Sequence, residues 1–259
     1  MKAASLIRGI GGIVVFMALW EAAVRIGAMR YEYLPAPTAA LTALAELAQE
    51  GMLLGEILHT VGVALIGWTV AVAIGVLFGA ALGISSTLRT YSLTTIELLR
   101  PLPAVALVPV GLLLFGFSAK TELFVIIIPS VWPVLVNTMA GIMTVPARLR
   151  DVAQSMRLRV LEVILKVYIP AAAPAILVGC RLSMSIALVL AIVAEMIGNP
   201  EGLGNAVVRE AQALNPGAMF AYVFLTGLLG ILLNALLVGL SRVLLPGEFR
   251  RPVATGGRA

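Results

Sequence analysis

The sequence has little charge and one cysteine, and each shortage excludes a class of protein; its only histidine is His59. Charged residues make up 12% and hydrophobic residues 61% of the chain, whereas soluble domains have roughly 25% charged and 45–50% apolar residues. The single cysteine, Cys180, excludes a disulfide framework and a cysteine metal cluster within one chain. The apolar residues occur in long blocks, which indicates transmembrane helices.

The sequence also lacks the usual motifs of enzymes. It contains neither G-x-S-x-G nor H-E-x-x-H. The nearest approach to a phosphate-binding loop, Ala119-Lys120-Thr121, has no glycine before the lysine. We therefore expect no catalytic site, metal or cofactor in this chain, so that any ATP and Mg²⁺ would be bound by partner subunits. The net charge of +5 is divided among separate loops, which does not indicate a nucleic-acid partner.

Six apolar segments predict an all-α polytopic membrane protein with six transmembrane helices. Their approximate bounds are 10–26, 57–84, 105–117, 123–143, 176–197 and 219–244. The third is shorter than the ~20 residues that cross a bilayer, so we expect its proline-rich approach to supply the rest. The predicted parts of the chain are an N-terminal span with an external surface helix (1–56), a transmembrane domain (57–246) and a basic flexible tail (247–259).

Lysine and arginine are distributed unevenly between the two sides of this predicted bundle. With the N-terminus inside, fourteen of the 18 lie on the cytoplasmic side, as the positive-inside rule requires. The four on the outside are Arg25, Arg30, Lys120 and Arg209. Both termini and the loop between the fourth and fifth spans are therefore predicted to be cytoplasmic.

That cytoplasmic loop, residues 144–174, is amphipathic and basic. Thr144 is placed to cap a first helix, with Pro146 in its first turn. An apolar stripe at helical spacing follows, formed by Leu149, Val152, Ala153 and Met156. Two interpretations stay open: the stripe docks on another protein, or the loop packs on its own bundle.

A second short helix is predicted over residues 160–168 of the same loop. It contains Glu162 and Lys166 at i, i+4, the favourable order for an ion pair on a helix surface. We expect Pro170 and Pro174 to end it, because proline lacks the N–H that a helix interior needs.

Several residues within or near the spans are candidates for a pathway or gate. Arg100, Pro101 and Pro103 lie in a segment with three prolines, which predicts irregular backbone beside a pathway or, alternatively, a simple kink. Arg181 is expected to reach the cytoplasmic interface, and a role in an inner gate is the alternative. Glu195, at the outer edge of the fifth span, either serves the pathway or braces the glycine-rich turn at 198–204, and bracing is favoured.

Two further features concern packing. The second span has a small residue at every fourth position from Gly67 to Gly83, which lets another helix approach closely, either within the chain or in a second copy. In the first external loop, Thr38 is placed to cap a helix that runs to about Gln49 along the membrane surface.

The cytoplasmic loop resembles the coupling loop of ABC-importer permeases. Asp151-Val152-Ala153 corresponds to the E-A-A triplet of the family signature, Arg157 to its glycine, and Ile169-Pro170 to its closing Leu-Pro. Further motifs, similar in order and spacing to the nitrate/sulfonate/taurine branch, are Leu34-Pro35-Ala36-Pro37, Leu99-Arg100-Pro101-Leu102-Pro103, Asn137-Thr138 with Gly141, and Ala194-Glu195-Met196-Ile197-Gly198 followed by Gly202-Leu203-Gly204. The resemblance extends from about Trp20 to Pro246.

The resemblance implies a permease in the bacterial plasma membrane that forms a pore with a second copy. Its other partners would be two cytoplasmic ATPase subunits, an extracytoplasmic solute-binding protein and membrane lipid. The cargo would be a small anion such as a sulfonate, taurine or nitrate. Asp151, Arg157 and Arg159 would then fix the polar register of the docked loop, and its apolar stripe would either seat in a groove or brace the loop.

Arg157 departs from this pattern, because glycine adopts a left-handed backbone at little cost and arginine does not. We therefore expect the first helix to run on through Arg157 with right-handed or bridge-region dihedral angles.

Two other functions remain to be separated from this one by experiment. A stand-alone secondary transporter or channel would move solute without ATPase subunits, but the spans offer few intramembrane charges for ion coupling. A membrane scaffold would give no solute flux in vesicles containing all the subunits.

Overall fold

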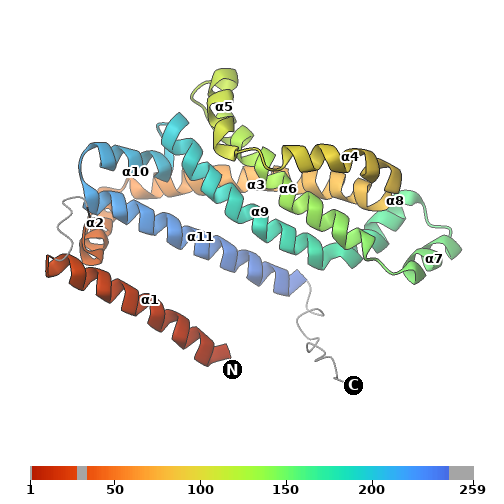
Figure 1. The fold of residues 1–259 in the computed structure, drawn as a ribbon, viewed down its shortest axis with the longest axis horizontal. Helices are drawn as coiled ribbons and strands as arrows, with labels where there is room; N and C mark the ends of the chain where they lie inside the picture. The colour runs from red at the N-terminus through yellow and green to blue at the C-terminus, as the bar shows by residue number, and fades with distance from the viewer. Residues whose placement is uncertain (1, 28–33, 245–259) are drawn as a thin grey trace.

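The computed structural model describes residues 2–27 and 34–244, and within these residues every regular element is a helix (Figure 1). The elements are α1 (Lys2–Arg25), α2 (Pro37–Glu50), α3 (Leu53–Ile84), α4 (Ser86–Leu99), η1 (Ala104–Ala106), α5 (Leu107–Phe115), α6 (Ala119–Met143), α7 (Ala147–Ser155), α8 (Val160–Val163), η2 (Ile164–Tyr168), α9 (Ile169–Gly198), α10 (Gly202–Gln212) and α11 (Pro216–Leu244). The predicted tail at 247–259 lies outside the described residues.

Four helices are long and apolar enough to cross a membrane. They are α3, α6, the continuous helix Val160–Gly198, and Pro216–Arg242 within α11. They match the predicted second, fourth, fifth and sixth spans. A fifth candidate span is the pair Ser86–Leu99 and Ala104–Phe115, which is bent by 80°.

The region of the predicted third span differs from the expectation, because a separate helix, α4, precedes the prolines. Its N-terminus is capped by Ser85, whose Oγ accepts the backbone N–H of Leu88 at 3.2 Å. The sharp bend then falls between Leu99 and Ala104, where Pro101 and Pro103 remove backbone donors that a continuous helix would need.

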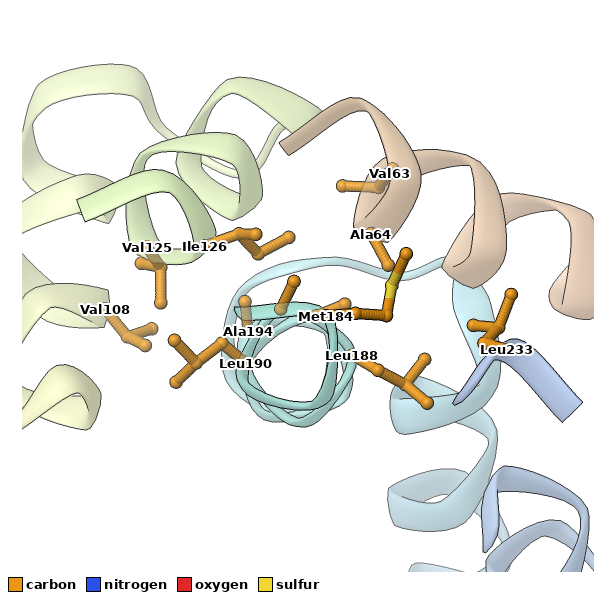
Figure 2. Close-up of a cluster of buried hydrophobic side chains, with 12 residues drawn as sticks. Val63, Ala64, Val108, Val125, Ile126, Met184, Leu188, Leu190, Ala194 and Leu233 are labelled. Atoms are coloured by element: carbon orange, nitrogen blue, oxygen red, sulfur yellow. The ribbon is translucent and has the colours of Figure 1, made fainter. Parts of the chain in front are cut away.

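The core lies where α3, α6 and α9 pack together. Figure 2 shows α9 nearly end-on, with side chains of α3, α5, α6 and α11 around it. The labelled residues are Val63, Ala64, Val108, Val125, Ile126, Met184, Leu188, Leu190, Ala194 and Leu233. These side chains come from segments distant in sequence, so they fasten the three long helices into one bundle.

The small-residue stripe of α3 faces α6 of the same chain. A Cβ added at Gly67 would lie 2.6 Å from Ile126 Cγ2, and one added at Gly79 would lie 2.6 Å from the backbone oxygen of Leu135. Such distances are below normal van der Waals contact, so the two helix backbones lie very close. Of the two interpretations of this stripe, packing within the chain is confirmed for these glycines.

The prediction that Pro170 and Pro174 end a helix is wrong, because the helix continues from Val160 to Gly198. The residues before Pro170 form a π-helical turn, η2, in which the N–H of Ile169 bonds to the oxygen of Ile164. A regular α-helix would drive the proline ring into the carbonyl of Lys166, and the wider turn shifts the hydrogen-bond ladder at this point.

The prediction that Thr38 caps the external helix is also wrong. Helix α2 begins at Pro37, after Ala36. The N–H of Thr38 is bonded at 3.0 Å to Glu21 Oε2 of α1, and the hydroxyl of Thr38 donates to Glu21 Oε1 at 2.8 Å. A carboxylate from another helix therefore satisfies the start of α2, which sequence spacing alone did not show.

The close approach of α3 to α6 makes Gly79 intolerant of a side chain. We expect Gly79→Ala to lower the stability of the chain by about 1–3 kcal/mol, because the added methyl group meets backbone rather than a flexible side chain. The measurement is thermal unfolding of the purified protein in detergent. Gly62→Ala is the matched control on the same helix, since its Cβ would have no atom within 4 Å. Equal melting temperatures for the two variants would contradict this packing.

Candidate functional site

Helix α7 lies at one end of the long helices, and α10 and α2 lie at the other (Figure 1). The prediction that Thr144 caps α7 is wrong, because Thr144 closes α6 instead. Its N–H bonds to Ala140 O at 3.2 Å and its hydroxyl donates to Gly141 O at 2.8 Å. Helix α7 begins at Ala147, after Pro146.

The predicted apolar stripe divides into one buried and three exposed residues. Ala153 is only 2% exposed and therefore faces the rest of the chain. Leu149 is 44%, Val152 55% and Met156 66% exposed. The chain thus leaves most of the stripe uncovered, and this exposed apolar face, formed by Leu149, Val152 and Met156, is available to a partner.

The prediction that Arg157 has right-handed or bridge-region dihedral angles is wrong. Its φ is +50°, in the left-handed region. The N–H of Leu158 bonds to Ala153 O at 3.2 Å, the six-to-one bond of a Schellman motif, which closes a helix around a left-handed residue. Helix α7 therefore stops at Ser155 and the chain turns at Arg157, as it would at a glycine, at a cost of roughly 1–2 kcal/mol.

The turn leads into the second helix, where the predicted ion pair is confirmed. Lys166 Nζ lies 3.0 Å from Glu162 Oε1. The other oxygen of Glu162 accepts the N–H of Arg159 at 3.0 Å, so this carboxylate also caps the start of α8. The side chains of Asp151, Arg157 and Arg159 are exposed. Pro170 lies beyond them, in the first turn of α9.

The pathway candidates are not gathered into one site. Arg100, Pro101 and Pro103 are exposed at the bend between α4 and α5, whereas Arg181 is exposed on α9. Within the described residues, neither guanidinium group makes a hydrogen bond or an ion pair. Their roles in a pathway or gate therefore stay predictions.

Glu195, near the end of α9, lies at the opposite end of the bundle from α7. Its buried carboxylate contacts the start of α10. Its Oε2 atom accepts the N–H of Gly204 at 2.9 Å and the hydroxyl of Thr60 at 3.0 Å. The Thr60 hydroxyl in turn accepts the N–H of Leu203 at 2.9 Å. Side chains from α9 and α3 thus cap the first turn of α10, which is the bracing role that the sequence favoured. We call these contacts the α9–α10 junction.

Gly202 is required by this junction. Its φ is +88°, and a Cβ there would lie 2.3 Å from the carboxyl carbon of Glu195. Any side chain would displace the carboxylate from its hydrogen bonds with the Gly204 N–H and the Thr60 hydroxyl.

Three other residues at this end of the bundle, His59, Glu122 and Asn199, were not predicted from the sequence. Glu122, fully buried at the start of α6, lies beside His59 of α3 and accepts a hydrogen bond from the side chain of Asn199. The available signal was an acid next to an apolar segment together with the only histidine of the chain.

The surface next to the junction has a charged network. Arg209 Nη2 lies 3.0 Å from Glu56 Oε1 and 3.3 Å from the hydroxyl of Tyr222. Burial lowers the pKa of Arg209, but the hydrogen bond to Glu56 and its negative charge outweigh burial and raise the pKa above its ordinary value. This network ties α10 to α3 and α11.

Comparison with known proteins decides the family. Residues 71–249 match the model of the family described as "Binding-protein-dependent transport system inner membrane component". The chain belongs to this family. The chain is thus an ABC-importer permease of the nitrate/sulfonate branch, the family that its sequence motifs resemble.

Two relatives show the range of the family. The chain is 30% identical over 231 residues to the putative aliphatic sulfonates transport permease of Bacillus subtilis, covering 89% of this chain and 84% of the relative. It is also 30% identical over 184 residues to the nitrate import permease of Synechococcus elongatus, covering 70% of this chain and 66% of the relative.

The solved structures agree in fold. An inward-facing structure of the MetNI methionine ABC transporter contains a chain that matches with a TM-score of 0.66 at 14% identity, covering 74% of this chain and 95% of that one. At this identity the match supports the arrangement of helices and nothing about cargo.

The left-handed turn allows a test that separates backbone from charge at Arg157. We expect Arg157→Gly to relieve roughly 1 kcal/mol of strain and to keep ATP-dependent uptake, because the conformation suits glycine. Arg157→Val should impair uptake, since a β-branched residue disfavours a positive φ. The measurement is uptake by the reconstituted complex. Equal losses in both variants would contradict the backbone role and assign the function to the side chain.

Proposed function

We propose that this permease forms the translocation pore of an ATP-driven importer together with a second copy of itself. Two cytoplasmic ATPase subunits bind its α7 region, and an extracytoplasmic solute-binding protein delivers the cargo. ATP and Mg²⁺ are bound by the ATPase subunits. The exposed apolar face of α7 carries the proposal, because it is an uncovered surface at the position where the family signature lies.

The proposed topology has six spans. In chain order they are α1, a helix of 24 residues, then α3, the bent pair of α4 with α5, α6, the continuous helix Val160–Gly198, and α11. The positive-inside count supports cytoplasmic termini in a bacterial plasma membrane. With this orientation α7 is the cytoplasmic coupling helix between spans 4 and 5, and α10 is extracytoplasmic.

The mechanism follows from the shape of the α7 region. When ATP closes the two ATPase subunits, force must reach the spans through a segment that does not bend freely. Helix α7 begins three residues after the C-cap of α6 and ends in a Schellman turn that leads into the continuous helix Val160–Gly198. A displacement of α7 is therefore transmitted to both α6 and α9, which line the core with α3.

The cargo we propose is a small anion. The relatives named above are described as permeases for aliphatic sulfonates and for nitrate, and a further relative, from Synechococcus elongatus, as one for bicarbonate. Uptake of radiolabelled taurine, an alkyl sulfonate and nitrate by proteoliposomes with all subunits tests this class. Transport driven by an ion gradient in the permease alone would contradict the proposal and favour a secondary transporter.

The apolar face of α7 supplies a sharp test of docking. We expect Val152→Asn to weaken association with the ATPase subunits about tenfold per site, since burying a valine contributes roughly 1.5–3 kcal/mol and part of that is lost. The measurement is titration of the detergent-solubilised permease with purified ATPase subunit. Ser155→Asn is the matched control, because Ser155 is exposed on α7 outside the apolar stripe. If both variants bound as the wild type does, this face would not be the docking surface.

A further inference from the structure

One imidazole and two buried carboxylates converge at the extracytoplasmic end of the bundle. His59 of α3, Glu122 of α6 and Glu195 of α9 each offer one ligand atom, and these atoms all lie within 4.8 Å of one another. Both glutamates are fully buried. We call these three residues the His59–Glu122–Glu195 cluster. It joins the three helices that form the core of the bundle.

Hydrogen bonds satisfy only part of this cluster. Oε2 of Glu195 accepts from Thr60 and Gly204, but its Oε1 is buried and has no hydrogen-bond partner among the described residues. An unsatisfied buried acceptor is costly, and a charged one more so. The second carboxylate, Glu122, adds like-charge repulsion at short range. A positive charge between the two carboxylates would remove both penalties.

The histidine is held as metal-ligating histidines are. His59 Nδ1 lies 3.0 Å from Oε2 of Glu201, an exposed residue. A carboxylate on the far nitrogen fixes the proton on Nδ1, so that Nε2 presents a lone pair. Nε2 lies 3.2 Å from Glu122 Oε2 and 3.1 Å from Nδ2 of Asn199, which also donates to Glu122 Oε1. Nε2 and Glu122 Oε2 still face each other as two acceptors, and a cation between them would replace the Asn199 hydrogen bond on Nε2.

The unpartnered oxygen of Glu195 is what distinguishes a cation from a proton here. A doubly protonated His59 would bridge Glu122 and Glu201, but it would leave Glu195 Oε1 without a partner. A metal ion would draw on all three residues, whose ligand atoms lie within 4.8 Å of one another. With metal–ligand bonds of about 2.0–2.2 Å and a tetrahedral angle, two ligand atoms lie roughly 3.3–3.5 Å apart, close to the separation of His59 Nε2 and Glu122 Oε2.

We propose that the His59–Glu122–Glu195 cluster binds one divalent first-row transition-metal ion, of the Zn²⁺ or Mn²⁺ kind, that fastens the outer ends of α3, α6 and α9. A set of one nitrogen and carboxylate oxygens suits these ions, whereas Mg²⁺ and Ca²⁺ prefer oxygen alone. A surface cavity lined by Glu56, His59, Glu201 and Gly202 gives access from outside. The proposal departs from the expectation that the chain holds no metal.

The test uses the purified full chain in detergent without nucleotide. After dialysis against a chelator, the protein is given Zn²⁺, Mn²⁺, Mg²⁺ or Ca²⁺, desalted, and analysed for metal content and melting temperature. We expect about one Zn²⁺ or Mn²⁺ per chain and a rise of a few degrees in melting temperature, because an ion that binds only the folded state stabilises it. Equal effects of all four ions, or of none, would overturn the proposal.

Variants assign the binding to these residues. His59→Gln and Glu122→Gln should each lose the bound metal under conditions where the wild type keeps it, and Glu201→Gln should weaken binding roughly tenfold through the outer hydrogen bond. Glu46→Gln, on exposed α2, is the matched control and should bind as the wild type does. Metal retained at the wild-type level by His59→Gln or Glu122→Gln would contradict the site. If a variant fails to fold, the metal content and melting temperature of the wild type still decide whether the proposal holds.

Discussion

Backbone groups at helix ends need hydrogen-bond partners, and inside a membrane protein water supplies few of them. This constraint explains several of the polar contacts between helices in the described residues. Glu21 of α1 satisfies the start of α2, and Glu195 with Thr60 satisfies the start of α10. Arg89 of α4 donates to the carbonyls of Leu82 and Gly83 at the end of α3. Each cap comes from a different helix, so capping also fixes how the helices lie relative to one another.

The same constraint shapes the segment that we propose as the cytoplasmic coupling helix. Helix α7 ends in a Schellman turn at Arg157, and the π turn before Pro170 keeps the next helix continuous. Both devices satisfy backbone groups between α7 and α9, and under the proposed function a displacement of α7 passes through this short connection to the spans.

Periodicity and composition were sufficient to predict the helical class, the long spans, the apolar stripe on α7 and the Glu162–Lys166 pair. These features depend on local sequence. The left-handed turn at Arg157, the continuous helix through Pro170 and the cap that Glu21 provides to α2 depend on contacts or backbone adjustments that residue propensities do not encode. Arginine disfavours a positive φ, and proline disfavours a helix interior, so propensity gave the wrong answer where the fold as a whole overrides it.

The outer end of the bundle illustrates a second limit. Glu195 was a candidate from its position at the edge of a span, but Glu122 and His59 became informative only when three helices brought them together. A lone acid beside an apolar segment and a lone histidine each have many ordinary explanations. Their meeting point is a property of helix packing, which the α3 glycines determine by allowing α6 to approach.

The central claim is that the outward face of α7 contacts an ATPase subunit and moves with it. Site-directed cross-linking tests it most directly. In a Cys180→Ser background, Met156→Cys is combined with single cysteines along the ATPase groove, and cross-linking is compared with and without ATP. The account predicts efficient cross-links at Met156→Cys whose pattern changes with ATP, and weak ones at Ser155→Cys. Equal cross-linking at both positions, or none at Met156→Cys in an active complex, would contradict it.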